Sequence, residues 1–180
     1  MGWRNTPESF GKVSKLLHWV MAVLVIVLLA VGLTMGGLDM PLKFKVYALH
    51  KSFGICVLAL VVCRIIWHIY SRRPGFVEGM KPWEKIAAHA AHVFLYVAMI
   101  GMPLSGWLMS SAKGYTVTVF STLDLPHLIG ESKELARLFS TTHAWLAYAL
   151  IAAVAAHIGA ALKHHFINKD ATLTRMLPFK

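Results

Sequence analysis

Histidines are the residues of this chain whose type and spacing indicate chemistry. Ten occur among 180 residues, which include only eight Asp or Glu. A neutral imidazole buried in apolar surroundings is costly without a partner, and imidazole is the commonest metal ligand in proteins. The first candidates for a functional site are therefore the histidines within or beside long apolar segments: His18, His50, His89, His92, His143, His157 and His164.

The histidines near the C-terminal end have the spacing of one helical face. The residues between His143 and His157 carry no charge. On a helix these two histidines are about 21 Å apart along the axis and about 40° from eclipsed, so they share a face. His164 follows seven residues later, near the same face. Sorted by expected membrane depth, His50 and His143 form an outer layer, and the other five form an inner layer.

Three kinds of chemistry fit two layers of histidines. A haem is flat and apolar and takes axial ligands from opposite sides, so two haems would fit between the helices. A non-haem metal site usually recruits carboxylates, and the expected spans contain no Asp or Glu. A proton or ion pathway also usually includes a carboxylate. The spacing favours two haems and leaves the other two readings open.

Four long apolar segments must position these histidines. They cover about residues 16–35, 50–70, 87–110 and 142–163, and each has the length and composition of a membrane-spanning helix. The whole chain is 57% hydrophobic, with a mean hydropathy of +0.61. Four spans use nearly all of the chain. We therefore expect one domain, residues 1–180, with an all-α fold: an integral membrane bundle of four transmembrane helices.

The net charge of +10 is explained by membrane topology. No soluble segment remains to bind nucleic acid, which excludes that class of partner. With the N-terminus in the cytoplasm, two thirds of the Lys and Arg residues lie on the cytoplasmic side, which predicts an N-in/C-in arrangement. No Cys-x-x-Cys-His motif occurs, and this excludes covalent attachment of a c-type haem.

The longest connection, about residues 111–141, is expected on the outer side. A connection of this length usually has a function or structure of its own. Residues 114–120 are expected to lie against the membrane surface, and residues 131–139 are expected to form a short separate helix.

Several short motifs resemble the bacterial cytochrome b561 family, in order and spacing, over nearly the whole chain. They are Leu17-His18-Trp19, Ala48-Leu49-His50-Lys51, Pro103-Leu104-Ser105-Gly106-Trp107, the series His143, His157, His164 and His165, and the tail from Lys169-Asp170 through Thr172 to Arg175-Met176. Each motif alone is weak, but the set is fairly specific. Within the family, the chain is most similar to superoxide oxidase-like cytochromes, which pass electrons from superoxide to ubiquinone.

This resemblance implies four spans around two haem b groups in the inner membrane of a bacterium. It implies that His50 and His143 bind the iron of an outer haem, and that His18 and His157 bind the iron of an inner haem. His164 matches a family position near the quinone site. The implied activity is that of an oxidoreductase, which moves electrons from a periplasmic donor such as superoxide to ubiquinone.

Cations for the anionic haem propionates are also present. Lys51 follows His50 at the outer end, and Arg64 lies late in the second span. For Arg64 the favoured interpretation is a side chain that reaches out to the inner membrane interface, and a partner for a propionate is the alternative. His89 and His92 are lower-ranked candidates on the inner level.

Two other functions remain open. In one, the chain is a haem b membrane anchor that relays electrons for a dehydrogenase or hydrogenase partner protein. In the other, it is a proton or ion transporter without redox chemistry. A visible spectrum separates the transporter from the cytochromes, and a copurifying soluble subunit would favour the relay. In every case, lipid surrounds the chain.

Overall fold

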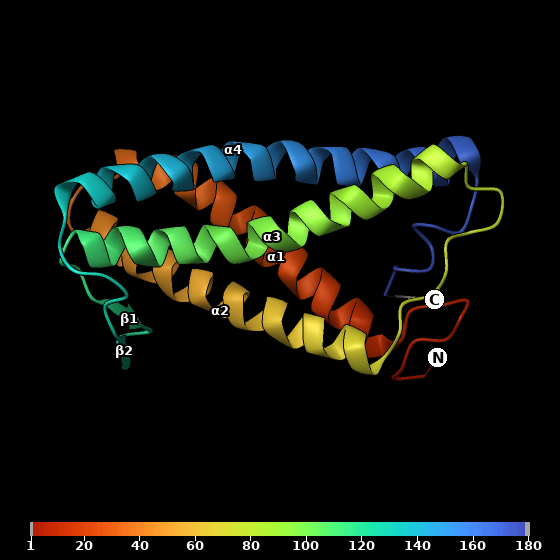
Figure 1. Ribbon diagram of the computed structural model, residues 1–180, viewed down its shortest axis with the longest axis horizontal. Coiled ribbons are helices and arrows are strands. Elements are labelled where there is room, and N and C mark those ends of the chain that lie inside the picture. Colours follow the sequence, from red (N-terminus) through yellow and green to blue (C-terminus); the bar gives the residue numbers. More distant parts are fainter. Residues whose placement is uncertain (1, 179–180) are drawn as a thin grey trace.

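The computed structural model describes residues 2–178, and four long helices run along its length (Figure 1). They are α1 (Lys12–Thr34), α2 (Leu42–Tyr70), α3 (Pro82–Ala112) and α4 (Lys133–Lys163). Each is long and apolar enough to cross a membrane. Both chain termini lie at one end of the bundle, here called the terminal end; the opposite end is the hairpin end. The expected all-α bundle of four membrane helices is confirmed.

Four short elements complete the fold. At the hairpin end, β1 and β2 form a small antiparallel sheet in which Val117 pairs with Leu125. At the terminal end, α4 continues into one π-helical turn. The elements are η1 (Met35–Gly37), β1 (Val117–Val119), β2 (Leu123–Leu125) and η2 (His164–Asn168).

The core lies midway along the bundle. Each helix contributes one buried apolar residue to it: Val25, Val57, Ala98 and Leu150. Leu150 lies halfway between His143 and His157 in α4, so this apolar layer separates the two expected histidine layers. Many large apolar side chains face outward instead, as expected for helices whose surroundings are lipid.

The helices are longer than the spans expected from hydropathy. α2 begins at Leu42 rather than near His50, and residues 133–139 form the first turns of α4 rather than a separate short helix. The connection on this side is therefore shorter than expected and holds the β-hairpin. Ser132 explains the early start of α4, because its hydroxyl accepts a hydrogen bond from the backbone N–H of Leu135 at 3.3 Å.

Hydrogen bonds fasten the C-terminal tail to α1 at the terminal end. The Lys15 ammonium is buried and donates to the Leu177 carbonyl at 2.8 Å. The Trp19 indole donates to the Met176 carbonyl at 2.9 Å. These contacts satisfy polar groups that would otherwise be buried without partners, and they hold the tail against the first turns of α1.

Candidate functional site

Two histidines from different helices face each other toward the hairpin end. His50 belongs to α2 and His143 to α4, and their ring centroids are 6.4 Å apart, with an interplanar angle of 72°. The structure therefore brings together the two outer histidines that the sequence singled out.

The ring of His143 is oriented by α3. Its Nδ1 lies 3.1 Å from the Met102 carbonyl oxygen and 3.0 Å from the Ser105 hydroxyl. Because a carbonyl oxygen only accepts, Nδ1 carries the proton and donates to it. The lone pair of this neutral imidazole is then on Nε2, which is the arrangement that a metal ligand needs.

Two glycines allow neighbouring helices to approach these imidazoles closely. A Cβ atom on Gly106 of α3 would lie 3.3 Å from Cε1 of His143. A Cβ atom on Gly32 of α1 would lie 3.3 Å from Cε1 of His50. Gly106 stands within one of the sequence motifs, whereas sequence reasoning missed Gly32. Its signal was a glycine inside an otherwise apolar helix, where glycine is unfavourable unless close packing requires it.

A second facing pair lies toward the terminal end. His18 of α1 and His157 of α4 have ring centroids 6.2 Å apart, with an interplanar angle of 56°. The ring of His92 from α3 is also close to His157, at 5.5 Å. His89 is exposed and makes no such contact with these rings. Of the two lower-ranked histidines, only His92 therefore joins this cluster.

The separation of each pair matches a metal bound between two imidazoles. A metal bound at about 2 Å to a ring nitrogen, itself about 1 Å from the ring centre, holds two such rings about 6 Å apart. The pairs at 6.2 and 6.4 Å agree with this value, while the 5.5 Å between His92 and His157 is shorter. Within residues 2–178 there is no group of three or more His, Cys, Asp or Glu side chains arranged for a metal ion. The two facing pairs therefore have the spacing that a haem with one imidazole on each side would need.

Arg64 turns inward beside the second pair. One terminal nitrogen of its guanidinium lies 3.2 Å from Nδ1 of His18, and its Cζ atom lies 5.8 Å from the centre of the Tyr96 ring. The side chain is half-buried. Sequence reasoning missed Tyr96, because nothing in the spacing of one aromatic residue in a span distinguishes it from a packing residue.

Lys51 lies at the hairpin end, one residue after His50. Its ammonium nitrogen is 5.7 Å from the centre of the Tyr115 ring, which belongs to the connection before β1. The lysine is half-buried and is the nearest cation in sequence to the first histidine pair. Its position agrees with the expected location of a cation at this end.

His164 is buried where α4 passes into the π-helical turn. Its Nδ1 lies 2.5 Å from a carboxylate oxygen of Asp170 and 3.1 Å from the side-chain amide of Asn168. Burial alone would raise the pKa of Asp170, but hydrogen bonds from Thr172 and His164 lower that pKa to about 2. Asp170 is therefore ionised at neutral pH and faces the imidazole as an acceptor.

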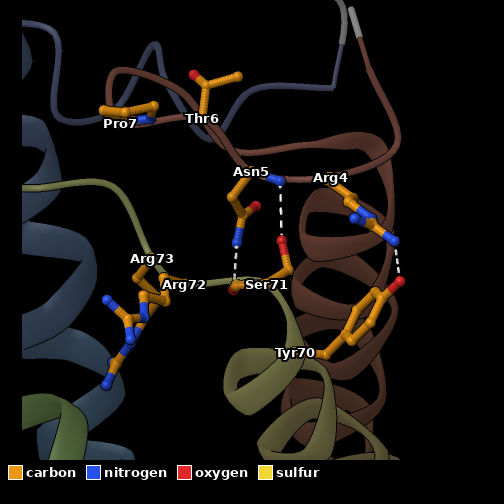
Figure 2. A pocket seen from close by; sticks show the side chains of 8 residues that line it. All are labelled: Arg4, Asn5, Thr6, Pro7, Tyr70, Ser71, Arg72 and Arg73. Carbon is orange, nitrogen blue, oxygen red and sulfur yellow. Dashed lines mark hydrogen bonds between the residues drawn. The ribbon is translucent and has the colours of Figure 1, made fainter.

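Basic residues also line a cleft of about 230 Å³ at the terminal end. Figure 2 shows it between the N-terminal segment, residues 4–7, and residues 70–73, where α2 ends and the next connection begins. Asn5 joins the two walls, because its backbone N–H donates to the Ser71 hydroxyl and its side-chain amide donates to the Ser71 carbonyl, both at 2.9 Å. Arg4 lies on one side of these bonds, and Arg72 and Arg73 lie on the other.

Comparisons with known proteins identify the family of the chain. Residues 9–179 match the model of the family described as prokaryotic cytochrome b561. The chain is 37% identical to cytochrome b561 homolog 2 of Escherichia coli strain K12, over 98% of this chain and 95% of that protein. It is 35% identical to cytochrome b561 homolog 1 of the same strain, over 95% and 98%.

A more distant relative is the probable superoxide oxidase CybB of Yersinia pestis. It is 29% identical to this chain, over 91% of this chain and 93% of that protein. The match to the family model spans all four membrane helices and both histidine pairs. The chain therefore belongs to the prokaryotic cytochrome b561 family of multi-pass bacterial membrane proteins that bind haem b.

Proposed function

We propose that this chain, as one domain, binds two haem b groups and moves electrons across the bacterial inner membrane. The observation that carries this proposal is the presence of two facing histidine pairs at ring separations of 6.2 and 6.4 Å. His18 and His157 would hold the haem nearer the terminal end, and His50 and His143 the one nearer the hairpin end. Each bound haem iron supplies one-electron chemistry by alternating between its ferric and ferrous states.

Both pairs depend on α4, which fixes their spacing. His143 and His157 lie on this one helix, about 21 Å apart along its axis. The N-in/C-in arrangement puts the terminal end in the cytoplasm and the hairpin end in the periplasm, in accord with the distribution of Lys and Arg. The protein would thus connect a periplasmic electron donor with an acceptor near the cytoplasmic face.

The propionates of each haem need cations at their own level of the membrane. Lys51 would serve the haem nearer the hairpin end, and Arg64 would serve the other. Arg64 lies beside His18 at 3.2 Å, so it is at the level of the bundle where His18 would hold a haem.

Ubiquinone is the proposed electron acceptor, with His164 at its site. Reduction of ubiquinone to ubiquinol takes up two electrons and two protons. The Asp170 carboxylate lies 2.5 Å from Nδ1 of His164, and it stabilises a proton on that nitrogen. When Nε2 also carries a proton, it can donate a hydrogen bond to a quinone carbonyl and give up that proton as the electrons arrive.

Superoxide is the proposed donor, and two superoxide ions would give two electrons and two molecules of dioxygen. The name of the relative from Yersinia pestis supports this chemistry. Four lysines lie in segments of the hairpin end: Lys43, Lys45, Lys51 and Lys113. A local cluster of positive charge raises the encounter rate of a small anion.

The donor is tested by mixing superoxide with the oxidised protein and following haem reduction, then ubiquinol formation. We expect fast reduction that slows with added salt, and about tenfold slower reduction at low ionic strength in Lys43→Gln/Lys45→Gln. The control, Lys85→Gln/Lys169→Gln, removes the same charge at the terminal end and should retain the wild-type rate. Slow reduction that neither salt nor the lysine changes affect would favour a protein or quinol donor instead.

A further inference from the structure

Three buried polar atoms without hydrogen-bond partners gather between α2 and α3. They are Nε of Arg64, Nδ1 of His68 and the hydroxyl of Tyr96, three of the five such side-chain atoms among residues 2–178. The rings of His68 and Tyr96 have centroids 6.5 Å apart, and Cζ of Arg64 lies 5.8 Å from the centre of the Tyr96 ring. The three side chains therefore form one cluster.

Such a cluster is unusual because buried polar groups in proteins nearly always have partners. A guanidinium held partly out of water is stabilised by an anion beside it. Within the described residues the two ion pairs are Lys163 with Glu84 and His164 with Asp170, so neither supplies an acidic partner to Arg64. The protein around Arg64 thus contains positive charge and donors without a matching carboxylate.

The chemistry of the three groups defines what would satisfy them. Arg64 and Tyr96 each offer an N–H or O–H donor, and His68 offers one when Nδ1 carries its proton. A carboxylate has two oxygens that together accept several hydrogen bonds, and it pairs especially well with a guanidinium. A phosphate is bulkier and would need more donors than this buried cluster provides.

We propose that Arg64, His68 and Tyr96 form a cradle for one propionate carboxylate of the haem held by His18 and His157. This inference rests on the proposed function, and it adds His68 and Tyr96 as positioning residues. The contact of Arg64 with His18 supports it. When His18 binds iron through Nε2, its Nδ1 carries a proton. The guanidinium of Arg64 and Nδ1 of His18, 3.2 Å apart, would then both be donors and could not hydrogen-bond to each other. The guanidinium would therefore be available to a carboxylate.

The cradle has a measurable electrostatic consequence. Donors and positive charge near a haem favour its ferrous form, which carries one positive charge fewer than its ferric form. Loss of the Tyr96 hydroxyl or of the His68 imidazole therefore lowers the midpoint potential of this haem. Loss of the Arg64 charge should lower the potential further, because a full charge is removed.

The test is a spectroelectrochemical titration of the purified holoprotein, with the haem content measured alongside. In Tyr96→Phe and in His68→Leu we expect two haems per chain, as in the wild type. One of the two midpoint potentials should fall, by up to about 59 mV, which is a tenfold change in the ratio of reduced to oxidised haem. The matched control is Tyr148→Phe, at a tyrosine of α4 whose side chain is exposed; both of its potentials should stay at the wild-type values.

The outcomes separate the cradle from the proposed function. Two haems with unchanged potentials in Tyr96→Phe and His68→Leu would overturn the cradle and leave the proposed function intact. An equal fall of both potentials would also overturn it, because the effect would not be local. A wild-type protein without a haem that depends on His18 and His157 would overturn the proposed function and the cradle together. Should Tyr96→Phe lose haem, the His68→Leu titration still decides.

Discussion

At the residue scale, expected membrane depth placed His50 with His143, and the family resemblance paired His18 with His157; both pairs of rings face each other in the structure. The other partners of these imidazoles depended on the tertiary fold. The shared face of His143 and His157 follows from helical geometry alone. The Met102 carbonyl that orients His143 could not be predicted, because backbone acceptors leave no mark in a sequence. The contacts of Tyr96 with His68 and of Asp170 with His164 were not predicted either, because each depends on how separate segments of the chain pack together. Haem ligation by the four histidines stays a prediction.

His164 carries the first residue-scale prediction. In His164→Ala both haems should remain, while ubiquinone reduction should slow by about a hundredfold to ten-thousandfold, the usual contribution of a positioned proton-transferring group. The measurement is ubiquinol formation after haem reduction, with His165→Ala as the adjacent control. Unchanged turnover with both haems present would show that His164 has no part in quinone reduction.

The second residue-scale prediction concerns Asp170. Because the pKa of Asp170 is lowered from 3.8 to about 2, its ionised form stabilises the folded tail at any pH above about 4. This stabilisation is lost as the pH falls toward 2. Asp170→Asn should therefore destabilise the protein by about 1–2 kcal/mol at pH 5, after allowance for partial exposure. Thermal unfolding in detergent measures this, and a difference that grows on acidification below pH 4 would contradict the assignment.

At the element scale, hydropathy predicted the four helices but not their lengths or how closely they pack. α2 and α4 both extend beyond their apolar segments at the hairpin end, because amphipathic turns and the Ser132 cap continue the helix outside the hydrocarbon. The β-hairpin was not predicted, since its two strands are only three residues each. Gly32 and Gly106 allow close approach to His50 and His143, and the sequence alone did not indicate which side chains they would meet.

The glycine contacts predict an effect of one methyl group. Alanine favours a helix over glycine by about 1 kcal/mol, so Gly106→Ala should stabilise α3 unless its Cβ meets a neighbour. Here the Cβ would lie 3.3 Å from the imidazole of His143, so we expect loss or weaker binding of one haem. The matched control is Gly54→Ala in α2, where a Cβ would meet nothing within 4 Å. The ratio of haem to protein is measured for both variants, and equal ratios would contradict the close approach.

At the scale of the whole molecule, composition predicted a membrane bundle, and the distribution of charge predicted its orientation. The membrane bundle is confirmed by four helices that are able to span a membrane.

The orientation is tested by single cysteines at the two ends of the bundle, in a background with Cys56 and Cys63 replaced by Ala. A membrane-impermeant maleimide should label Lys113→Cys in intact spheroplasts, and Lys169→Cys only after the membrane is opened. The reverse pattern would invert the proposed direction of electron flow.

If each histidine pair holds one haem b, the haem content of the purified protein shows it. The pyridine haemochrome assay on purified protein should give two haem b groups per chain for the wild type. It should give one for His143→Ala and one for His157→Ala, with two retained in His127→Ala, a histidine of the connection after β2. A wild-type protein with one haem or none, or two haems retained in both His143→Ala and His157→Ala, would contradict the account.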